Sequence, residues 1–277
     1  MKLSIVEVLK GIKVRILKEF KRPYSKFNIS WLEEKKLKHS HPGQKYTHLY
    51  KNKYLVEFTD PKAFMYTVRE LFIDEIYKFT PDNNSPYIID CGAYIGTSIL
   101  FFKDNYPDAK ILGFEPDNKN LKLLKKNLSN WNLSDITIEN AAIWISNGHV
   151  TFASDGNMAS KITQGEISES NEHIKSIRLN DLLNKDVDFL KIDIEGAEYE
   201  VIKDCAENLS YVKNLFIEYH GNYDEMYKLN EILNILVNKG FKYYIKEAGS
   251  TYNQPFFETK NDYNFDIQLN LFAFKRK

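Results

Sequence analysis

The stretch "YIIDCGAYIGTS" at residues 87–98 contains the features that decide the fold. Aromatic and β-branched residues run up to an acid, Asp90, and Gly92 and Gly96 follow four positions apart. This pattern predicts a buried strand that turns sharply into a helix. Such a turn allows a ligand to approach the backbone closely, because glycine has no Cβ atom.

Outward from this turn, the sequence alternates between strand and helix patterns. Near-continuous apolar strands separated by helices predict an α/β fold with a mostly parallel sheet that is covered on both faces. The last two strands have only a loop between them and are expected to pair antiparallel. The expected strands are residues 87–92, 110–116, 136–144, 148–154, 187–195, 212–220, 241–249 and 265–274, and the expected helices are residues 97–106, 118–131, 196–209 and 224–240.

Composition limits the classes of function. The chain has 277 residues, of which 43% are hydrophobic, so it can bury a substantial core. Its 38 basic and 38 acidic residues give a net charge of zero, which disfavours a nucleic-acid partner. The two cysteines, Cys91 and Cys205, are interpreted as core thiols in a reducing compartment. We therefore expect a cytoplasmic globular protein.

The N-terminal part, residues 1–60, is expected to be an extension to a main domain at residues 61–277. Residues 1–22 have the pattern of a basic amphipathic helix. Packing on the core is the preferred interpretation, and peripheral contact with a membrane surface is the alternative. A further helix is expected at residues 61–79, where Pro61 opens an apolar pattern. No segment has the length of a membrane span or the features of a signal peptide.

Polar residues follow the predicted strands, at the sheet edge where α/β proteins bind ligands. Glu115 comes after the second strand, placed to accept hydrogen bonds from the two hydroxyls of a ribose. The other residues at strand ends are Asp90, Gly92, Pro116, Asp193, Glu195, Glu218 and His220.

The glycine spacing discriminates between nucleotides. A dinucleotide turn follows G-x-G-x-x-G, whereas here Asp90 stands where that pattern has its first glycine. A carboxylate at this place opposes a pyrophosphate but can hold an ammonium group, directly or through water. A ligand with a ribose and a positive charge is thus expected, and S-adenosylmethionine has both.

The segments "IIDCGAYIGTS", "GFEPDNKNLKLLKKN", "NAAIW", "DFLKIDIEGAE" and "LFIEYHG", in this order, resemble the FkbM family of S-adenosylmethionine-dependent methyltransferases. The resemblance runs from about residue 88 to the C-terminus, and "KIDIEGAE" is its most specific part. It implies a Rossmann-like methyltransferase fold with a seven-stranded sheet and an antiparallel C-terminal strand. It also implies O-methylation of sugars or other hydroxylated metabolites, commonly in bacterial glycan or secondary-metabolite pathways.

The resemblance further implies which residues bind the cofactor. Its methionine part would lie at the glycine turn, its ribose at Glu115, and its adenine near Ala141 and Ile143. Ser154 and Asp155 are weaker candidates. The full set of expected cofactor-binding residues is Asp90, Gly92, Ala93, Gly96, Thr97, Ser98, Glu115, Pro116, Ala141 and Ile143.

Methylation of a hydroxyl also needs a group that takes up the proton. Asp193, Glu195 and His220 are the expected catalytic residues, with Glu218 a less favoured acid. The purely structural alternative is that Asp193 and Glu195 cap the next helix, and Lys191 is expected to pair with an acid. No metal is expected, although Asp193, Glu195 and His220 could together bind a divalent ion.

Three other classes of function remain open from the sequence. A nucleotide-dependent oxidoreductase would share the sheet and Glu115, but not this glycine spacing. A nucleic-acid methyltransferase would share the cofactor, but the strand at residues 187–195 lacks the Asn/Asp-Pro-Pro-aromatic motif of enzymes that methylate base amines. A non-catalytic nucleotide-binding protein could use the same fold. The preferred partner is a small-molecule or glycan acceptor with a hydroxyl.

Overall fold

The computed structural model describes residues 23–153, 161–162, 171–248, 256 and 265–275. The chain divides into two compact units, Met1–Ile76 and Tyr77–Lys277. The basic amphipathic helix expected at residues 1–22 lies outside the described residues, and so do Ser154 and Asp155. In the described part of the chain, no helix is both long enough and apolar enough to cross a membrane.

The first unit has an aromatic core. The rings of Phe58 and Phe64 stack with centroids 3.8 Å apart, and those of Phe27 and Phe72 lie 4.4 Å apart. Phe64 and Phe72 follow residue 60, so this core extends the first unit to Ile76, beyond the boundary expected from the sequence. The unit contains η1 (Pro23–Phe27), α2 (Trp31–Lys38), β1 (Tyr46–Tyr50), β2 (Tyr54–Phe58), α3 (Pro61–Val68) and η2 (Arg69–Ile73).

The helix expected at residues 61–79 begins as predicted but is shorter. Asp60 caps α3 by accepting hydrogen bonds from the backbone N–H groups of Lys62 and Ala63. After Val68 the backbone continues as one π-helical segment, η2, and Glu75 then adopts the left-handed region with φ of +52°. A left-handed residue cannot continue a right-handed helix, so the helical segment ends before the predicted residue 79.

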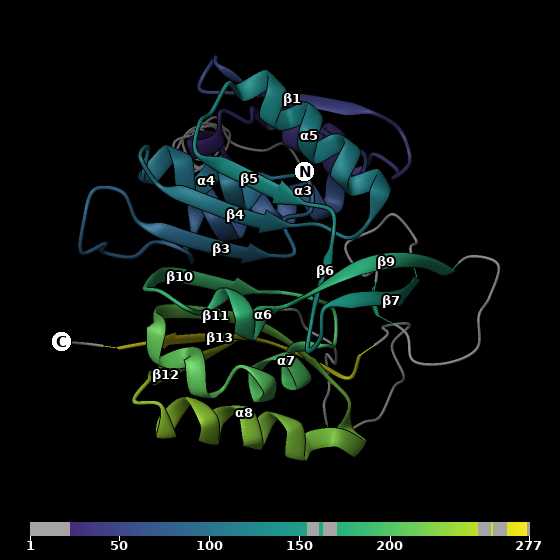
Figure 1. Cartoon of the computed structure of the whole chain (residues 1–277). Coiled ribbons are helices and arrows are strands. Elements are labelled where there is room, and N and C mark those ends of the chain that lie inside the picture. The colour runs from purple at the N-terminus through teal and green to yellow at the C-terminus, as the bar shows by residue number, and fades with distance from the viewer. Residues whose placement is uncertain (1–22, 154–160, 163–170, 249–255, 257–264, 276–277) are drawn as a thin grey trace, which may run out of the picture. The chain divides into compact units, whose positions relative to one another are not determined.

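The second unit is built on a seven-stranded sheet in the order β12-β13-β11-β10-β3-β4-β5 (Figure 1). Neighbouring strands are parallel except at β13, which pairs antiparallel with both β11 and β12. The predicted sheet and its antiparallel C-terminal strand are confirmed. The strands are β3 (Tyr87–Cys91), β4 (Lys110–Phe114), β5 (Ile136–Glu139), β10 (Val187–Ile192), β11 (Val212–Gly221), β12 (Lys242–Glu247) and β13 (Ile267–Phe274).

The strand order reverses between β3 and β10. From β3 the chain moves through β4 to β5 on one side, and β10 and β11 then extend the sheet on the other side. In open parallel sheets a ligand binds at such a switch point, beyond the carboxyl ends of the strands. The glycine turn after β3 and the acids after β10 both lie at this point.

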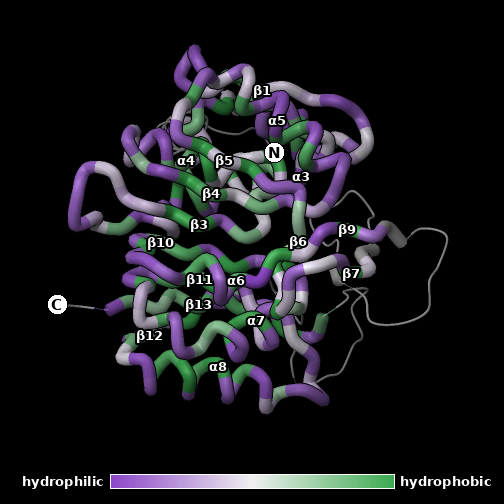
Figure 2. Tube along the Cα trace, in the orientation of Figure 1, coloured by the Kyte–Doolittle hydropathy of each residue, from purple (hydrophilic) through white to green (hydrophobic). Residues whose placement is uncertain are grey.

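Helices cover both faces of the sheet, as the continuous apolar strands predict. On one face, Leu190 and Ile217 belong to a buried cluster with Val201 of α7 and Ile232 of α8. On the other face, the Phe102 ring of α4 lies against β10. Figure 2 shows hydrophobic strands in the sheet and alternating hydrophobic and hydrophilic residues along α8. The helices are α4 (Thr97–Asn105), α5 (Asn118–Trp131), α7 (Glu198–Asp204) and α8 (Met226–Asn238), with the short α6 (Leu179–Leu182), η3 (Glu207–Tyr211) and η4 (Tyr223–Glu225).

A second sheet corrects one prediction. The single strand expected at residues 136–144 is two strands, because β5 ends at Glu139 and β6 (Ala142–Trp144) belongs to a four-stranded sheet with the order β6-β9-β7-β8. Asn140 lies between them, and its side-chain amide donates to the carbonyl oxygens of Glu115 and Pro116. The other strands of this sheet are β7 (Gly148–Ala153), β8 (Lys161–Ile162) and β9 (Asn171–Arg178), and β9 was not predicted.

Candidate active site

The glycine turn joins β3 to α4 and lies against β10. Gly92 has φ of +93°, and a Cβ atom added there would lie 2.1 Å from the carbonyl oxygen of Asp193. Only glycine fits this close approach of two backbones. The backbone N–H groups of Gly92 and Ala93 donate to the carbonyl oxygen of Phe114. The turn is therefore fixed to both neighbouring strands, β4 and β10.

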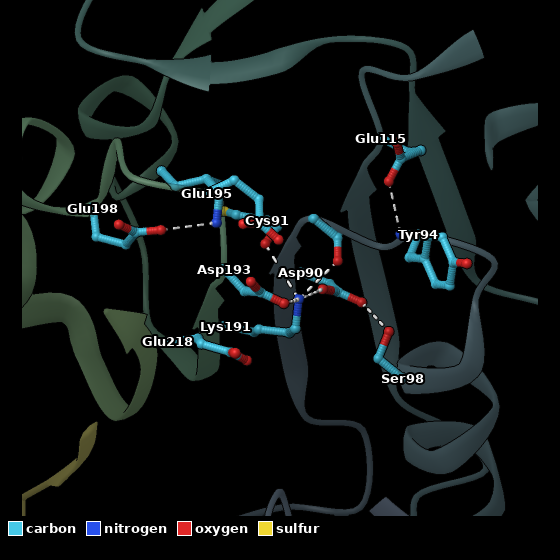
Figure 3. A network of polar contacts seen from close by, with 12 residues as sticks. Asp90, Cys91, Tyr94, Ser98, Glu115, Lys191, Asp193, Glu195, Glu198 and Glu218 are labelled. Carbon is cyan, nitrogen blue, oxygen red and sulfur yellow. Dashed lines mark hydrogen bonds and ion pairs between the residues drawn. The ribbon is translucent and has the colours of Figure 1, made fainter. Parts of the chain in front are cut away.

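Asp90 and Lys191 form the buried centre of the site. The Asp90 side chain is fully buried and accepts a hydrogen bond of 2.5 Å from the Ser98 hydroxyl. The Lys191 ammonium lies 3.4 Å from Asp90 Oδ1 and 3.0 Å from Asp193 Oδ2, and it donates to the Gly92 carbonyl at 2.7 Å. Figure 3 shows both carboxylates directed at this ammonium. The expected pairing of Lys191 with an acid is confirmed.

Burial and charge act against each other in this centre. Burial raises the pKa of Asp90, while Lys191 and the Ser98 hydroxyl lower it. Burial alone would lower the pKa of Lys191, but Asp193 and Asp90 raise it above its usual value. The Asp90 carboxylate is thus stabilised within the protein by the Lys191 ammonium and the Ser98 hydroxyl.

Glu115 follows β4 and reaches back to the glycine turn. Its Oε2 accepts a hydrogen bond of 2.7 Å from the backbone N–H of Tyr94, and its Oε1 accepts one of 2.9 Å from that of Asp117. Tyr94 has φ of +48°, which directs its N–H toward this acid. Burial raises the pKa of Glu115 to about 8, against the lowering effect of these two N–H groups. A carboxylate has about four lone-pair sites, so capacity for further donors remains.

The turn after β10 surrounds the carboxylate of Glu198. Glu195 adopts the left-handed region with φ of +55°, and Gly196 follows with φ of +99°. Non-glycine residues rarely adopt this conformation, and such residues often occur at functional sites. The backbone N–H groups of Ile194 and Gly196 donate to Glu198 Oε1, at 3.2 and 3.1 Å. The "DIEGAE" turn thus fixes one buried acid and leaves the Glu195 side chain 12% exposed.

His220 at the end of β11 lies among carboxylates. Its Nδ1 is 3.1 Å from Glu198 Oε1, and its Nε2 is 3.5 Å from Glu195 Oε2 and 3.8 Å from Glu218 Oε1. Burial lowers the pKa of His220, but these carboxylates raise it well above its usual value, Glu198 most strongly. Burial raises the pKa of Glu195 to about 8.

The structure brings the three expected catalytic residues together. Asp193, Glu195 and His220 each offer a ligand atom within 4.8 Å of the others. The structure places the expected cofactor-binding residues in three groups. The segment from Asp90 to Ser98 runs from β3 through the glycine turn into the first residues of α4, and Glu115 and Pro116 follow β4. Ala141 and Ile143 belong to the buried core cluster that also contains Cys91 and Phe114.

Two site residues were not predicted. Glu198 ends the "KIDIEGAE" motif of the family resemblance but was given no role of its own, and Tyr94 was expected only as part of the glycine turn. The motif marks Glu198 in the sequence, but no local pattern predicts its contact with His220, which comes 22 residues later. The parallel pairing of β10 with β11 creates this contact.

Comparison with known protein families shows to which family this chain belongs. A sequence profile of the Methyltransferase FkbM domain matches residues 90–243, more than half of the chain. The chain belongs to the FkbM methyltransferase family. The match begins at Asp90 and covers the glycine turn, Glu115 and the cluster at the ends of β10 and β11.

Individual methyltransferases are similar to part of this chain. Methyltransferase 1 of Beauveria bassiana is 27% identical over 176 residues, which covers 54% of this chain and 71% of the relative. The 2-O-methyltransferase NoeI of Sinorhizobium fredii is 25% identical over 174 residues, with the same two shares of 54% and 71%. The crystal structure of the methyltransferase FkbM from Methylobacillus flagellatus has a TM-score of 0.48 at 19% identity, and the match covers 74% of this chain and 47% of that protein. This chain thus spans about half the length of the crystallised protein.

Membership of the FkbM methyltransferase family supports S-adenosylmethionine as the cofactor. The residues at the glycine turn fit S-adenosylmethionine. Thr97 Oγ1 is buried there and has no hydrogen-bond partner among the described residues. A buried polar atom of this kind needs a partner, which a polar ligand can provide. Glu115 lies beside the same turn with acceptor capacity for hydroxyl donors.

Proposed function

We propose that this methyltransferase uses S-adenosylmethionine to methylate a hydroxyl of a sugar, a glycan precursor or a related small metabolite. The cluster of Asp193, Glu195 and His220 next to the glycine turn carries this proposal, because a hydroxyl must lose a proton when it is methylated. The relative NoeI is a 2-O-methyltransferase, which also supports an oxygen acceptor. The free cysteines Cys91 and Cys205 suit a cytoplasmic location.

We assign the cofactor to the ends of β3 and β4. Glu115 would accept hydrogen bonds from the ribose hydroxyls, and Thr97 would contribute its buried hydroxyl to a polar group of the ligand. Asp90 would act mainly through Lys191 and Ser98, because its fully buried carboxylate already pairs with both. Its effect on an ammonium group would therefore be indirect.

S-adenosylmethionine supplies a methyl group that is already activated by a positively charged sulfur, so the protein must chiefly position the acceptor oxygen in line with it. The carboxylates around His220 raise its pKa well above the usual value, so with no other positive charge at Nε2 the ring is protonated and cannot accept a proton. Burial raises the pKa of Glu195 to about 8, so above that pH its ionised carboxylate is a stronger base than an ordinary carboxylate, and its side chain is 12% exposed. We therefore assign proton acceptance to Glu195, with His220 positioning its carboxylate.

Methyl transfer can be tested with S-adenosylmethionine carrying a labelled methyl group and a panel of sugars, nucleotide-linked sugars and glycosides, the products being located by NMR. We expect the label on an oxygen. Glu195→Gln should lower turnover by about 10²- to 10⁴-fold while affinity for S-adenosylhomocysteine is unchanged. Glu207→Gln is the matched control, because Glu207 is 90% exposed in the same unit. Full turnover in Glu195→Gln, or label only on nitrogen or carbon, would refute the proposal.

A further inference from the structure

His220 directs one ring nitrogen into a group of acids. Its side chain is 2% exposed, and Nε2 lies 3.5 Å from Glu195 Oε2 and 3.8 Å from Glu218 Oε1. Both separations are longer than a good hydrogen bond, so Nε2 has these carboxylates as charged neighbours at ion-pair distance. A buried ring nitrogen that faces carboxylates needs a positive charge at that place, which is either a proton or a metal ion.

The other ring nitrogen has a defined partner. Nδ1 lies 3.1 Å from Glu198 Oε1, an oxygen that also accepts from the backbone N–H groups of Ile194 and Gly196. Because this carboxylate oxygen is an acceptor, Nδ1 must carry a proton, and Nε2 is then able to present its lone pair to a metal. Histidines that bind metals commonly donate their second N–H to a carboxylate in this way. Glu198 is fully buried, so this orientation is built into the core.

We infer that Asp193, Glu195 and His220 bind a divalent cation of the Mn²⁺ or Mg²⁺ type. This inference rests on the proposed function and deepens it, since a bound cation lowers the pKa of a hydroxyl coordinated to it. The three residues each offer a ligand atom within 4.8 Å of the others. Ligand atoms about 2.0–2.6 Å from one ion are separated by about 3–5 Å, so the observed spacing suits a shared cation.

The charges around the cluster favour an added cation. In the described part of the site, the carboxylates of Asp90, Asp193, Glu195, Glu198 and Glu218 surround Lys191 and His220. Lys191 contacts Oδ2 of Asp193, and a carboxylate has about four lone-pair sites, so Asp193 has capacity for a second positive group. A divalent ion at Nε2 would offset the remaining negative charge without displacing Lys191 from its place between Asp90 and Asp193.

The donor set selects the class of ion. Two carboxylate oxygens and one imidazole nitrogen suit Mn²⁺, and carboxylates with water suit Mg²⁺, whereas structural zinc sites use four nitrogen or sulfur ligands. Three protein ligands leave positions open for water or for an acceptor oxygen. Asp193 and Glu195 are 16% and 12% exposed, so the cluster is not sealed from solvent.

Mn²⁺ binding to the full-length protein after chelator treatment tests the inference without methyl transfer. Electron paramagnetic resonance measures free Mn²⁺ during the titration. We expect about one ion per chain, and at least a tenfold loss of affinity in Glu195→Gln and in Asp193→Asn. Glu207→Gln should bind as the unchanged protein does. Glu198→Gln should weaken binding by about 10- to 100-fold, because it releases the histidine that presents Nε2.

Affinity for S-adenosylhomocysteine shows that each variant is folded, and it separates this inference from the proposed function. Should Glu198→Gln fail to fold, because Glu198 is fully buried, the more exposed Asp193→Asn still reports on the site. Absence of Mn²⁺ binding up to 1 mM (a concentration on the order of the weakest biological cation sites) would overturn the inference and leave the proposed methyl transfer unaffected. Equal Mn²⁺ affinity in Glu195→Gln, Asp193→Asn and Glu207→Gln would also overturn it, since the ion would then bind elsewhere.

Discussion

Glu115 shows how one residue can make cofactor binding depend on pH. Burial raises its pKa to about 8, so the ionised fraction increases as the pH rises through that value. The ionised carboxylate is the better acceptor for two ribose hydroxyls, and hydrogen bonds to a charged group contribute about 1.5–3 kcal/mol. We therefore expect affinity for S-adenosylhomocysteine to increase severalfold between pH 6.5 and pH 9, as measured by calorimetric titration.

The matching variant is Glu115→Gln, which cannot ionise. It should bind S-adenosylhomocysteine about 10- to 100-fold more weakly at pH 9 and lose the pH dependence. Glu207→Gln, an exposed acid of the same unit, should keep both the affinity and the pH dependence of the unchanged protein. A pH dependence that persists in Glu115→Gln would assign the titration to another group.

The sequence predicted residues that the structure brings together at the candidate site, but, apart from the pairing of Lys191 with an acid, it did not predict their contacts. Asp90, Glu115, Asp193, Glu195 and His220 were predictable because each lies at or just after the end of a strand whose apolar pattern is local. Their contacts were not, since the parallel pairs β3·β10 and β10·β11 join segments far apart in the chain. Ser98, for example, was expected at the cofactor, and its hydrogen bond to Asp90 was not predicted.

At the scale of the elements, the turn after β3 depends on Gly92. An alanine there has to adopt a φ of +93°, which costs about 1–2 kcal/mol. Its Cβ would also lie 2.1 Å from the Asp193 carbonyl oxygen, and overpacking of this kind adds about 1–3 kcal/mol. We expect Gly92→Ala to lower the free energy of unfolding by the sum of both effects, as measured by urea denaturation.

Gly240→Ala separates the two effects. Gly240 belongs to the same unit and has φ of +81°, but a Cβ there would meet nothing within 4 Å. Gly240→Ala should therefore lower the free energy of unfolding only by the cost of the positive φ, and it should leave cofactor binding unchanged. Equal losses of stability in the two variants would mean that the close approach between β3 and β10 does not matter energetically.

The elements themselves were predicted where their pattern was long and regular. The seven strands of the main sheet and the helices α4, α5 and α8 fall close to the expected residues. The three-residue β6 was merged with β5, because Asn140 alone does not mark a strand end in the sequence. β9 was missed although Ile174 and Ser176 are buried and alternate with exposed His173 and Lys175, a period of two that signals a strand.

For the whole molecule, cofactor binding should appear as stabilisation of the second unit. A ligand at 100 times its Kd stabilises the folded state by about 2.7 kcal/mol. In a unit of this size each kcal/mol raises the Tm by about 2–4 °C. We expect S-adenosylhomocysteine to raise the Tm of the unit Tyr77–Lys277 by roughly 5–10 °C.

Tryptophan fluorescence can be made to report on that unit alone. The chain has 3 tryptophans, and Trp31 is the one in the first unit, where it is 41% exposed. In Trp31→Phe the signal comes from Trp131, which is 1% exposed, and from Trp144. The thermal shift should persist in this variant and should shrink when Glu115→Gln is added, because the weaker ligand then occupies fewer molecules. A full shift in the double variant would mean that the cofactor binds away from Glu115. The switch point of the sheet would then not be the place of methyl transfer.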